Sequence, residues 1–325
     1  MANTILLPLL ADGEFRSGQA LADALGVSRT AVWKQLKKLQ QLGLDIESVK
    51  GRGYRIPGGI ELLDDATLRA ALLPPVVQLL SRLEIHETID STNAQAMLAA
   101  EHGNATGLVC TTEQQTAGRG RRGRQWISPF ASNLYLSLVW EFHQGAAALE
   151  GLSLAVGVAV ARALANCGVP PVQLKWRNDV LFEGAKLGGI LLEMTGDATG
   201  VCQVVVGVGL NVSMSKTSAT AIDQAWTTVD TIAGPGHPGR NALLAALVNE
   251  LLPLLADFEA QGFARWRGEW LALDAYADTD VVLTSGERLV AGVARGVDER
   301  GALQLETTAG IQSIYGGEIS MRPAA

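Results

Sequence analysis

The sequence predicts an α+β protein of several domains, with a helical head, a central α/β body around a mixed sheet, and a small β-barrel at the end. Helical periodicity fills the head, strand-like runs alternate with helical ones in the middle, and short strands separated by turn signals follow from about residue 274. A chain of 325 residues is long enough for two or three domains. We place the domain limits at 1–62, 63–273 and 274–325.

Composition and charge indicate a globular protein whose parts have different partners. Apolar residues make up 48% of the chain, charged residues 18%, and the net charge is −7. Residues 1–62 hold eight Lys and Arg against six Asp and Glu, whereas the remainder holds 18 against 27. The slightly basic head therefore suits an anionic partner better than the acidic body does.

The sequence features favour a cytoplasmic protein without a membrane partner. The N-terminus lacks a basic segment and a small-residue cleavage site, so we expect no signal peptide. The apolar stretch 152–165 is interrupted by Arg162, so we expect no membrane span. The three cysteines are widely spaced and the four histidines form no cluster, so we expect neither disulfides nor a protein-held metal.

The head has the pattern of a helix-turn-helix followed by a wing. A first helix over about 18–25 ends at Gly26, and an N-terminal helix over 4–10 precedes it. Two strand-like runs, 45–49 and 54–56, are joined by a basic turn. The expected apolar face of the first helix is Leu21, Ala24 and Leu25.

The second helix and the wing carry residues suited to DNA. Ser28 is a good N-cap, and the helix buries Val32, Leu36 and Leu39 while its other positions are mostly polar or basic. Between residues 17 and 56 there are seven basic and three acidic side chains, the excess that phosphate contacts need. The alternative is a packing module with a solvated charged face. The residues expected at DNA are Ser28, Arg29, Thr30, Trp33, Lys34, Lys37, Lys50 and Arg52.

The body alternates strand and helix patterns. Helices are expected at 145–167 and 240–263, and Pro253 argues for a kink or break in the second. A connection with one helix is expected between 59 and 83. Strands of the body are expected at 107–112, 133–140, 172–176, 187–194 and 201–208, and those of the barrel at 281–283, 288–297, 303–307 and 311–315.

The run 115–126 is the strongest indication of chemistry. It places Arg119, Arg121, Arg122 and Arg124 beside three glycines in an acidic protein. Cationic side chains on a flexible backbone suit a polyphosphate or an acyl-phosphate. The glycine spacing matches a dinucleotide fingerprint, but a Ser-Pro pair and a strand follow where that fold requires a helix. The alternatives are a disordered basic loop and an RNA-binding patch.

Four further motifs place polar side chains at the ends of elements. Residues 90–93 open a helix, either as a cap or as ligand-binding hydroxyls. Residues 175–180 end a strand with amide and acid side chains, and 186–193 begins the next with a lysine and two glycines. The alternative for that pair is a β-turn with a solvated lysine. Residues 207–211 leave a strand through two glycines to Asn211, which either binds a sugar or phosphate or forms a turn.

In this order, the motifs resemble those of the bifunctional biotin–protein ligases that also repress biotin biosynthesis. The combination is highly specific, and it covers nearly the whole chain. The resemblance implies a central domain similar to class II synthetases and a C-terminal barrel similar to SH3 domains. The matching segments after the helix-turn-helix are Asp-Ser-Thr-Asn (90–93), Gly-Arg-Gly-Arg-Arg-Gly (118–123), Ser-Pro-Phe (128–130), Asn-Leu-Tyr-Leu-Ser (133–137), Lys-Trp-x-Asn-Asp (175–179), Lys-Leu-x-Gly-Ile (186–190) and Gly-x-Gly-x-Asn (207–211).

The resemblance implies a two-step biotin–[biotin carboxyl-carrier protein] ligase. The biotin carboxylate attacks the α-phosphate of ATP, with Mg²⁺, to form biotinyl-5′-AMP and pyrophosphate. A lysine of the biotin carboxyl carrier protein of acetyl-CoA carboxylase then accepts the biotin. The resemblance also implies a transcriptional repressor, in which the adenylate-bound homodimer binds a biotin operator.

The resemblance also implies roles for individual residues, carried over by motif. Asp179 is expected either to bind magnesium or to orient the acceptor lysine. The catalytic residues are Lys186, Arg121 and Asp179. The biotin-binding residues are Ser91, Thr92, Asn93, Gln115, Gly118, Arg119, Gly120, Arg121, Lys186 and Gly189. The ATP- or adenylate-binding residues are Arg119, Arg121, Arg122, Trp126, Asn178, Lys186 and Asn211.

Three positions depart from the family pattern, and two other functions compete with the ligase. Arg177 stands where the family usually has proline, Gly188 where alanine is frequent, and Thr116 where glutamine is common. None of them carries an implied role. A transcription factor that only senses biotin is disfavoured by Lys186 and Arg121. A ligase for another acyl group, such as lipoate, is disfavoured by the head and the arginine loop.

Overall fold

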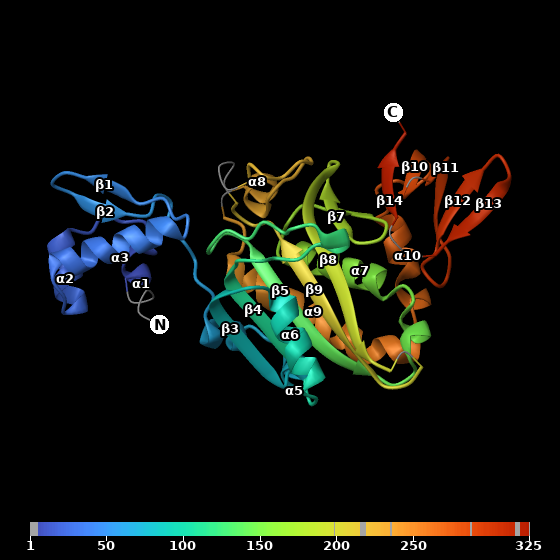
Figure 1. Cartoon of the computed structure of the whole chain (residues 1–325), viewed down its shortest axis with the longest axis horizontal. Coiled ribbons are helices and arrows are strands. Elements are labelled where there is room, and N and C mark those ends of the chain that lie inside the picture. The colour runs from blue at the N-terminus through green and yellow to red at the C-terminus, as the bar shows by residue number, and fades with distance from the viewer. Residues whose placement is uncertain are drawn as a thin grey trace.

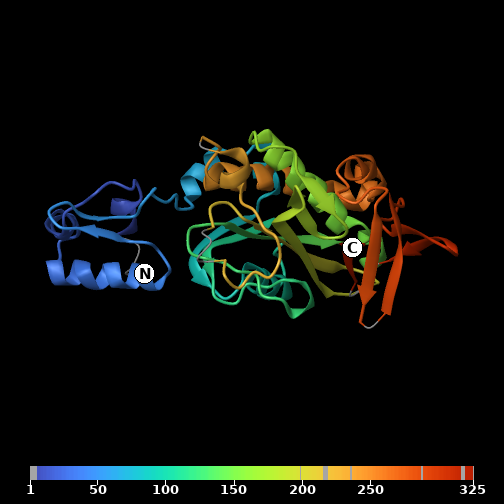
Figure 2. The same ribbon diagram turned by 90° about the horizontal axis from the view of Figure 1, so that it is seen from above.

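The computed structural model describes residues 6–197, 199–214, 219–234, 236–286, 288–315 and 319–324. It contains a head at one end, a central sheet with its helices, and a C-terminal sheet at the other end (Figure 1). The same succession is visible from above (Figure 2). The predicted order of a helical head, a mixed α/β body and a terminal β unit is confirmed.

The head forms the predicted helix-turn-helix and wing. Gly26 ends the first long helix in the left-handed region, with φ of 63°. The Ser28 Oγ accepts a hydrogen bond of 3.2 Å from the Ala31 N–H and caps the next helix, as expected. The elements are α1 (Leu7–Leu10), α2 (Gly18–Leu25), α3 (Arg29–Gln41), β1 (Glu47–Val49) and β2 (Gly53–Arg55).

The core of the head follows the predicted stripes with one correction. Val32, Leu36 and Leu39 of α3 are buried, as expected. On α2, however, Ala24 is exposed and Ala22 is buried in its place beside Leu21. Ala22 therefore takes the place that was expected for Ala24 on the buried face of α2. The first residues of the expected N-terminal helix, 4 and 5, lie outside the described residues.

The central domain contains a seven-stranded mixed sheet of order β3-β4-β5-β9-β8-β7-β6. The β3–β4 pair is parallel and the other neighbouring pairs are antiparallel. Leu134, Leu136 and Leu138 all lie in the main apolar core, as the alternating pattern predicted. The strands are β3 (Arg82–Ile89), β4 (Leu108–Gln115), β5 (Leu134–Phe142), β6 (Gln173–Lys175), β7 (Asp179–Phe182), β8 (Ala185–Gly196) and β9 (Cys202–Leu210).

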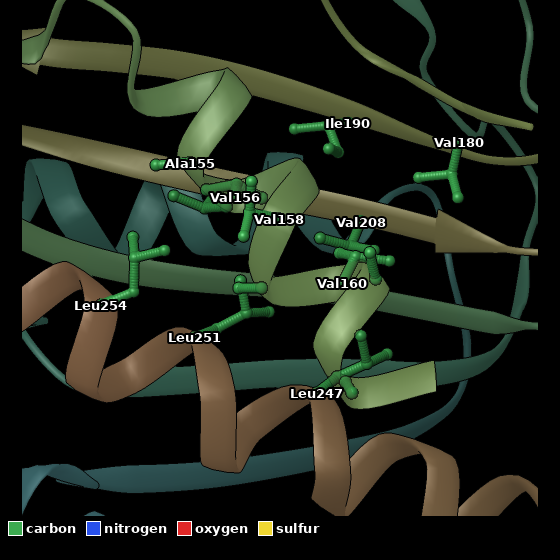
Figure 3. Packing of buried hydrophobic residues seen from close by; sticks show 14 of the residues in the cluster. Ala155, Val156, Val158, Val160, Val180, Ile190, Val208, Leu247, Leu251 and Leu254 are labelled. Carbon is green, nitrogen blue, oxygen red and sulfur yellow. The ribbon is translucent and has the colours of Figure 1, made fainter. Parts of the chain in front are cut away.

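Two long helices pack against one face of the sheet, and one shorter helix packs against the other. α7 (Leu152–Asn166) and α9 (Arg240–Gln261) share a core with the strands, with Val156 and Leu251 among its labelled side chains in Figure 3. α6 (Thr92–Glu101) buries its alanines against Val139 and Val205 on the opposite face. The mixed sheet is therefore covered on both faces.

The long helices correct two expectations. A kink or a break was expected at Pro253; α9 is continuous through that residue, so the break is wrong. The helical stretches Ala146–Asn166 and Arg240–Gln261 are long and apolar enough to cross a membrane by length and composition, although Arg162 lies in the first. Each candidate window is 61% buried inside the protein. We therefore assign both as helices of the apolar core.

Several short elements were missing from the sequence prediction. The strand β3 reads as alternating charged and apolar residues, typical of an edge strand with one covered face, and β7 is only four residues long. The expected helix at 145–167 begins as a 3-10 turn, η2 (Ala146–Leu149). Between 59 and 83, where one helix was expected, the structure has two, α4 (Asp65–Ala70) and α5 (Pro74–Leu79). The helices α8 (Val229–Ala233) and α10 (Ala264–Ala272) were not predicted.

The C-terminal unit is a five-stranded antiparallel sheet of order β13-β12-β11-β10-β14. It is joined to α10 by a hydrogen bond from Arg267 Nε to the Val297 carbonyl, 2.8 Å long. The fifth strand, β14, was not predicted from the sequence. The strands are β10 (Asp280–Ser285), β11 (Arg288–Val297), β12 (Leu303–Thr307), β13 (Gly310–Ile314) and β14 (Ser320–Pro323).

Candidate active site

A cavity of about 220 Å³ gathers most of the residues singled out in the sequence. Its walls come from the start of α6, the end of β4, the arginine loop, β7 to β9 and the segment 319–322 of the C-terminal unit. The predicted residues that line it are Ser91, Thr92, Asn93, Gln115, Arg119, Gly120, Arg121, Arg122, Trp126, Asn178, Asp179, Lys186 and Gly189.

The start of α6 forms a buried polar wall. Thr92 donates from its backbone N–H and its hydroxyl to Gln115 Oε1, at 2.9 and 3.2 Å. Asn93 donates to Glu193 Oε2 at 2.8 Å and accepts from the Ser137 hydroxyl at 2.6 Å. Ser91 occupies the N-cap position, but its side chain makes no capping bond. The capping interpretation of this motif is therefore wrong for the side chain of Ser91.

The two glycines of the Gly-x-Gly-x-Asn motif make room for side chains of the site. A Cβ on Gly209 would lie 2.5 Å from the ring of Trp126, and one on Gly189, its neighbour on β8, would lie 3.1 Å away. A Cβ on Gly207 would lie 2.1 Å from Asn93 Oδ1. The glycines therefore allow close approach by side chains, and do not form a turn.

The arginine loop folds over this cavity without the helix of a dinucleotide site. A single 3-10 turn, η1 (Arg121–Gly123), follows Gly120, whose N–H donates to the Arg124 carbonyl at 2.7 Å. Arg122 adopts the left-handed region, with φ of 61°. The loop base is fixed by Gln115 Nε2, which donates to the Ser128 hydroxyl at 2.9 Å. The rejection of the dinucleotide fingerprint is confirmed.

The loop arginines differ in how firmly they are held. Arg121 Nη1 donates to Asn178 Oδ1 at 2.9 Å, and burial lowers the pKa of its guanidinium. Arg119 is half exposed and lies 3.5 Å from Glu193. An ion pair of that length and exposure is weak. The loop therefore offers one anchored cation and one that can reorient toward an anionic ligand.

Lys186 and Asp179 form the charged centre of the cavity. Lys186 Nζ lies 2.6 Å from Asp179 Oδ1 and 5.6 Å from the centre of the Trp126 ring. Lys175 Nζ lies 3.9 Å from the other carboxylate oxygen, and burial lowers the pKa of Lys175. A solvated lysine in a β-turn is therefore not what the structure contains. Trp126 Nε1 is a buried donor without a partner in the described part of the chain.

Two predicted binding residues lie outside the cavity lining. Asn211 donates to the backbone carbonyls of Lys186 and Thr227 at 3.3 and 3.2 Å, so it holds the start of β8 in place. Gly118 packs behind the loop, where a Cβ would lie 2.4 Å from the Trp126 carbonyl. Direct contact of either residue with a ligand stays a prediction.

The cavity lining also contains polar residues to which the sequence analysis assigned no binding role. Lys175 was part of a quoted motif without an assigned role, and its charge was the available signal. The segment 319–322 reaches the cavity from a distant part of the chain, and nothing in its sequence indicated this. The added polar residues are Arg124, Gln125, Lys175, Arg177, Gln224, Ser320 and Arg322.

The expectation that the histidines form no ligand cluster needs one correction. The possible ligand atoms of Glu84, His86 and Cys110 lie within 4.8 Å of one another on β3 and β4. Glu84 is already paired with Arg82 at 2.9 Å, and burial raises the pKa of the Cys110 thiol to about 12. These interactions make the group an ordinary ion-pair cluster over a buried thiol.

The predicted DNA-facing residues form an exposed surface on the head. All eight are exposed, including Trp33 at 52% of its surface. Lys37 Nζ lies 5.7 Å from the centre of the Trp33 ring. The guanidinium of Arg52, in the turn of the wing, lies 4.0 Å from the centre of the ring of Phe15, which precedes α2. This basic, aromatic surface carries the features expected of a phosphate-binding face.

Comparison with known families matches all three parts of the chain. Residues 86–211 match the biotin/lipoate A/B protein ligase family, 2–55 an HTH domain, and 280–322 the biotin protein ligase C terminal domain. The bifunctional ligase/repressor BirA of Escherichia coli is 41% identical over 98% of this chain and 97% of that protein. The chain belongs to the bifunctional ligase/repressor family. The family's Bacillus subtilis member is 30% identical over 96% of this chain and 95% of its own length.

A solved structure supports the same assignment. The biotin protein ligase of Aquifex aeolicus in complex with biotin and ATP superposes with a TM-score of 0.63 at 28% identity. The match covers 75% of this chain and all of that protein. The central fold of this ligase/repressor family member is therefore that of a biotin protein ligase.

Proposed function

We propose that this protein forms biotinyl-5′-AMP from biotin and ATP, transfers biotin to a lysine of the biotin carboxyl carrier protein of acetyl-CoA carboxylase, and represses transcription from a biotin operator. The observation that carries the ligase activity is a single cavity that brings together the arginine loop, Lys186 and the start of α6. The names of the relatives and the biotin and ATP complex of the Aquifex ligase support the same substrates.

In the first step, a carboxylate must approach a polyphosphate, so positioned cations have to offset the repulsion. Lys186 and Arg121 suit this role because both are held in the cavity wall by short contacts, to Asp179 and Asn178 respectively. Arg119 suits retention of the adenylate together with Arg121 and Arg122, because its weak pairing with Glu193 leaves its guanidinium able to turn inward. An ordered loop over the mixed anhydride would exclude water from it.

In the second step, the amine of the acceptor lysine attacks the carbonyl carbon of biotin, and AMP leaves. Asp179 is the one carboxylate among the described residues that line the cavity. It is positioned to accept a hydrogen bond from the incoming amine once its pairing with Lys186 loosens on ligand binding. We therefore favour orientation of the acceptor lysine over metal binding for Asp179.

Mg²⁺ fits this cavity as a partner of ATP more than as an ion held by the protein. Asp179 already lies between the ammonium groups of Lys186 and Lys175. Mg²⁺ typically keeps several waters and binds substrate phosphates with few protein ligands. The side-chain oxygen of Asn178 likewise already accepts from the Arg121 guanidinium. The ion would neutralise phosphate charge during attack on the α-phosphorus.

The DNA-binding activity rests on the exposed basic face of the head. Helix-turn-helix proteins commonly bind two half-sites as dimers, so we extend the proposal to an adenylate-bound homodimer in the cytoplasm. Contacts between the cavity and the head support control by the ligand. Ser128 accepts from Gln115 in the cavity wall, and Phe130, two residues later, lies in the apolar cluster of the head.

The direct test of the ligase activity is biotin-dependent exchange of labelled pyrophosphate into ATP. We expect exchange with biotin and none with lipoate. Exchange with lipoate alone would identify a ligase for that acyl group, and binding of biotin without exchange would identify a sensor. Arg121→Gly, which removes the anchored cation of the loop, should release adenylate and label proteins at random. Normal retention of adenylate by that variant would contradict the role of the loop.

A further inference from the structure

Trp33 is a large aromatic side chain on the outer side of α3, the second helix of the helix-turn-helix. Val32, Leu36 and Leu39 of the same helix are buried in the core of the head, whereas Trp33 lies outside that core and is 52% exposed. A single exposed aromatic side chain needs no partner by itself. Its surroundings therefore decide what it can bind.

The surroundings of Trp33 on α3 are basic. Arg29, Trp33 and Lys37 are spaced by four residues, so they share one face of the helix. The attraction between the Lys37 ammonium and the Trp33 ring, 5.7 Å from Nζ to the ring centre, keeps the ring beside a positive charge. Over its whole length, α3 has four basic side chains and no acidic one. By charge complementarity, this face suits a polyanion such as DNA and disfavours a basic partner.

The position of Trp33 along α3 indicates which part of the DNA it meets. In helix-turn-helix proteins the second helix lies in the major groove, and residues near its N-terminus contact base edges. α3 begins at Arg29, so Trp33 lies near that N-terminus. Base edges in the major groove carry hydrogen-bond donors and acceptors, and thymine adds a C5-methyl group as an apolar feature. The indole ring offers a broad apolar surface and a single N–H donor, so the methyl group is the feature that it matches best.

We propose that Trp33 contacts the C5-methyl group of a thymine in each half of the operator and selects thymine at that position. This inference rests on the DNA-binding activity proposed above, and it gives that surface a base preference. Lys37 is the positioning residue, because its ammonium lies against the ring. The contact removes apolar surface from water and forms no ion pair. It therefore adds sequence preference without adding salt dependence.

The test uses a duplex that the full-length protein, with biotin and ATP present, selects from a pool of random-sequence DNA. Deoxyuridine then replaces one thymidine at a time, which removes the C5-methyl group and keeps the pairing with adenine. Affinities are measured for the wild type, Trp33→Ala, Trp33→Phe and a control, Leu98→Ala. Leu98 is 50% exposed, much like Trp33, but it lies on α6 of the central domain.

We expect the wild type to lose about fourfold in affinity at the contacted thymine, the factor that burial of one methyl group provides. Trp33→Ala should bind the unmodified duplex about tenfold more weakly, as for a truncated aromatic anchor, and distinguish thymine from uracil by less than about twofold. Its slope of log affinity against log salt should equal that of the wild type. Trp33→Phe should keep most of the preference, and Leu98→Ala should keep all of it.

Folding of each variant is checked by thermal unfolding and by biotin-dependent pyrophosphate exchange. Both should match the wild type, because Trp33 lies outside the core of the head and away from the cavity. If the alanine variant fails this check, Trp33→Gln takes its place in the same comparison, because glutamine also lacks the apolar ring.

Three outcomes would overturn the inference. In the first, no thymine replacement changes the affinity of the wild type. In the second, the wild type and Trp33→Ala lose equally on replacement, which would assign the methyl effect to another residue or to the shape of the DNA. In the third, Trp33→Ala loses self-association in sedimentation together with its DNA affinity, which would place the ring between two heads. Failure of the DNA-binding proposal itself is distinguishable, because the wild type would then select no duplex from the pool.

Discussion

The buried ion pair between Glu113 and Arg240 provides a sharp test of how the head is attached to the catalytic domain. Glu113, on β4, accepts from Arg240 Nη1 at 2.7 Å, and the two side chains are 7% and 4% exposed. Its other oxygen accepts from the backbone N–H of Leu63, in the segment that leads out of the head, at 2.6 Å. Glu113→Ala removes both contacts at once.

The expected cost follows from what the substitution leaves behind. Removing one partner of a buried pair typically costs about 3–5 kcal/mol, because the other charge stays buried without compensation. Arg240 keeps bonds to the carbonyls of Glu61 and Asn133, which offset part of this loss. The orphaned N–H of Leu63 adds a cost of about 1 kcal/mol or more. We therefore expect the free energy of unfolding of the central domain to fall by about 4 kcal/mol.

The assay is thermal unfolding of the full-length protein, with the transition of the central domain identified by tryptophan fluorescence. For a domain of this size, the expected loss corresponds to a decrease in Tm of about 10 °C. Glu269→Ala is the matched control, because it breaks an exposed pair with Arg162 and should cost about 1 kcal/mol or less. Glu113→Ala combined with Arg240→Met should recover part of the lost stability, because the uncompensated buried charge is gone while the Leu63 N–H stays unpaired. A Glu113→Ala loss no larger than that of the control would refute the reasoning.

The remaining predictions concern the site, the head and pH. Gly209→Ala should displace Trp126, since the new Cβ would lie 2.5 Å from its ring, and lower adenylate affinity at least tenfold by calorimetry; unchanged affinity would contradict the close approach. Lys37→Ala should reduce the slope of log affinity for operator DNA against log salt by about 0.9, and an unchanged slope would remove Lys37 from the phosphate contacts. Burial raises the pKa of Asp274 to about 6. The folded state therefore holds a proton that the unfolded state loses first, so this group's contribution to stability should fall as pH rises from about 4 to about 6. Asp274→Asn should abolish that component in denaturation curves, and an identical pH dependence would contradict the assignment.

The local features of the sequence anticipated much of the fold. Gly26 and Ser28 mark the turn of the head because a left-handed residue and a hydroxyl cap act within one helical turn. The alternation in β5 placed its leucines on one face for a similarly local reason. β3, α10 and β14 were missed because their patterns are short or mix charged and apolar residues, so only pairing and packing decide their state.

For the candidate site too, the sequence predicted some features and only the structure showed the others. The motifs at 90–93, 115–126, 175–180 and 186–193 identified the side chains of its centre, because their residue types and order suit an anionic substrate. The sequence showed glycines at 207 and 209 but not why glycine is needed there. The reason is the close approach of the side chains of Asn93 and Trp126, which come from distant segments.

The sequence by itself determined the order of the three parts, the exposed basic residues of the head and the charged residues that line the cavity, because residue type, periodicity and capping act over a few positions. The tertiary structure decided which of those residues share one cavity. It placed Asn211 behind the wall, brought 319–322 from the C-terminal sheet to the cavity, and put Arg177 in the cavity lining. Those outcomes depend on packing between segments that are far apart in the sequence. The burial of a polar or charged side chain is set only when such segments meet.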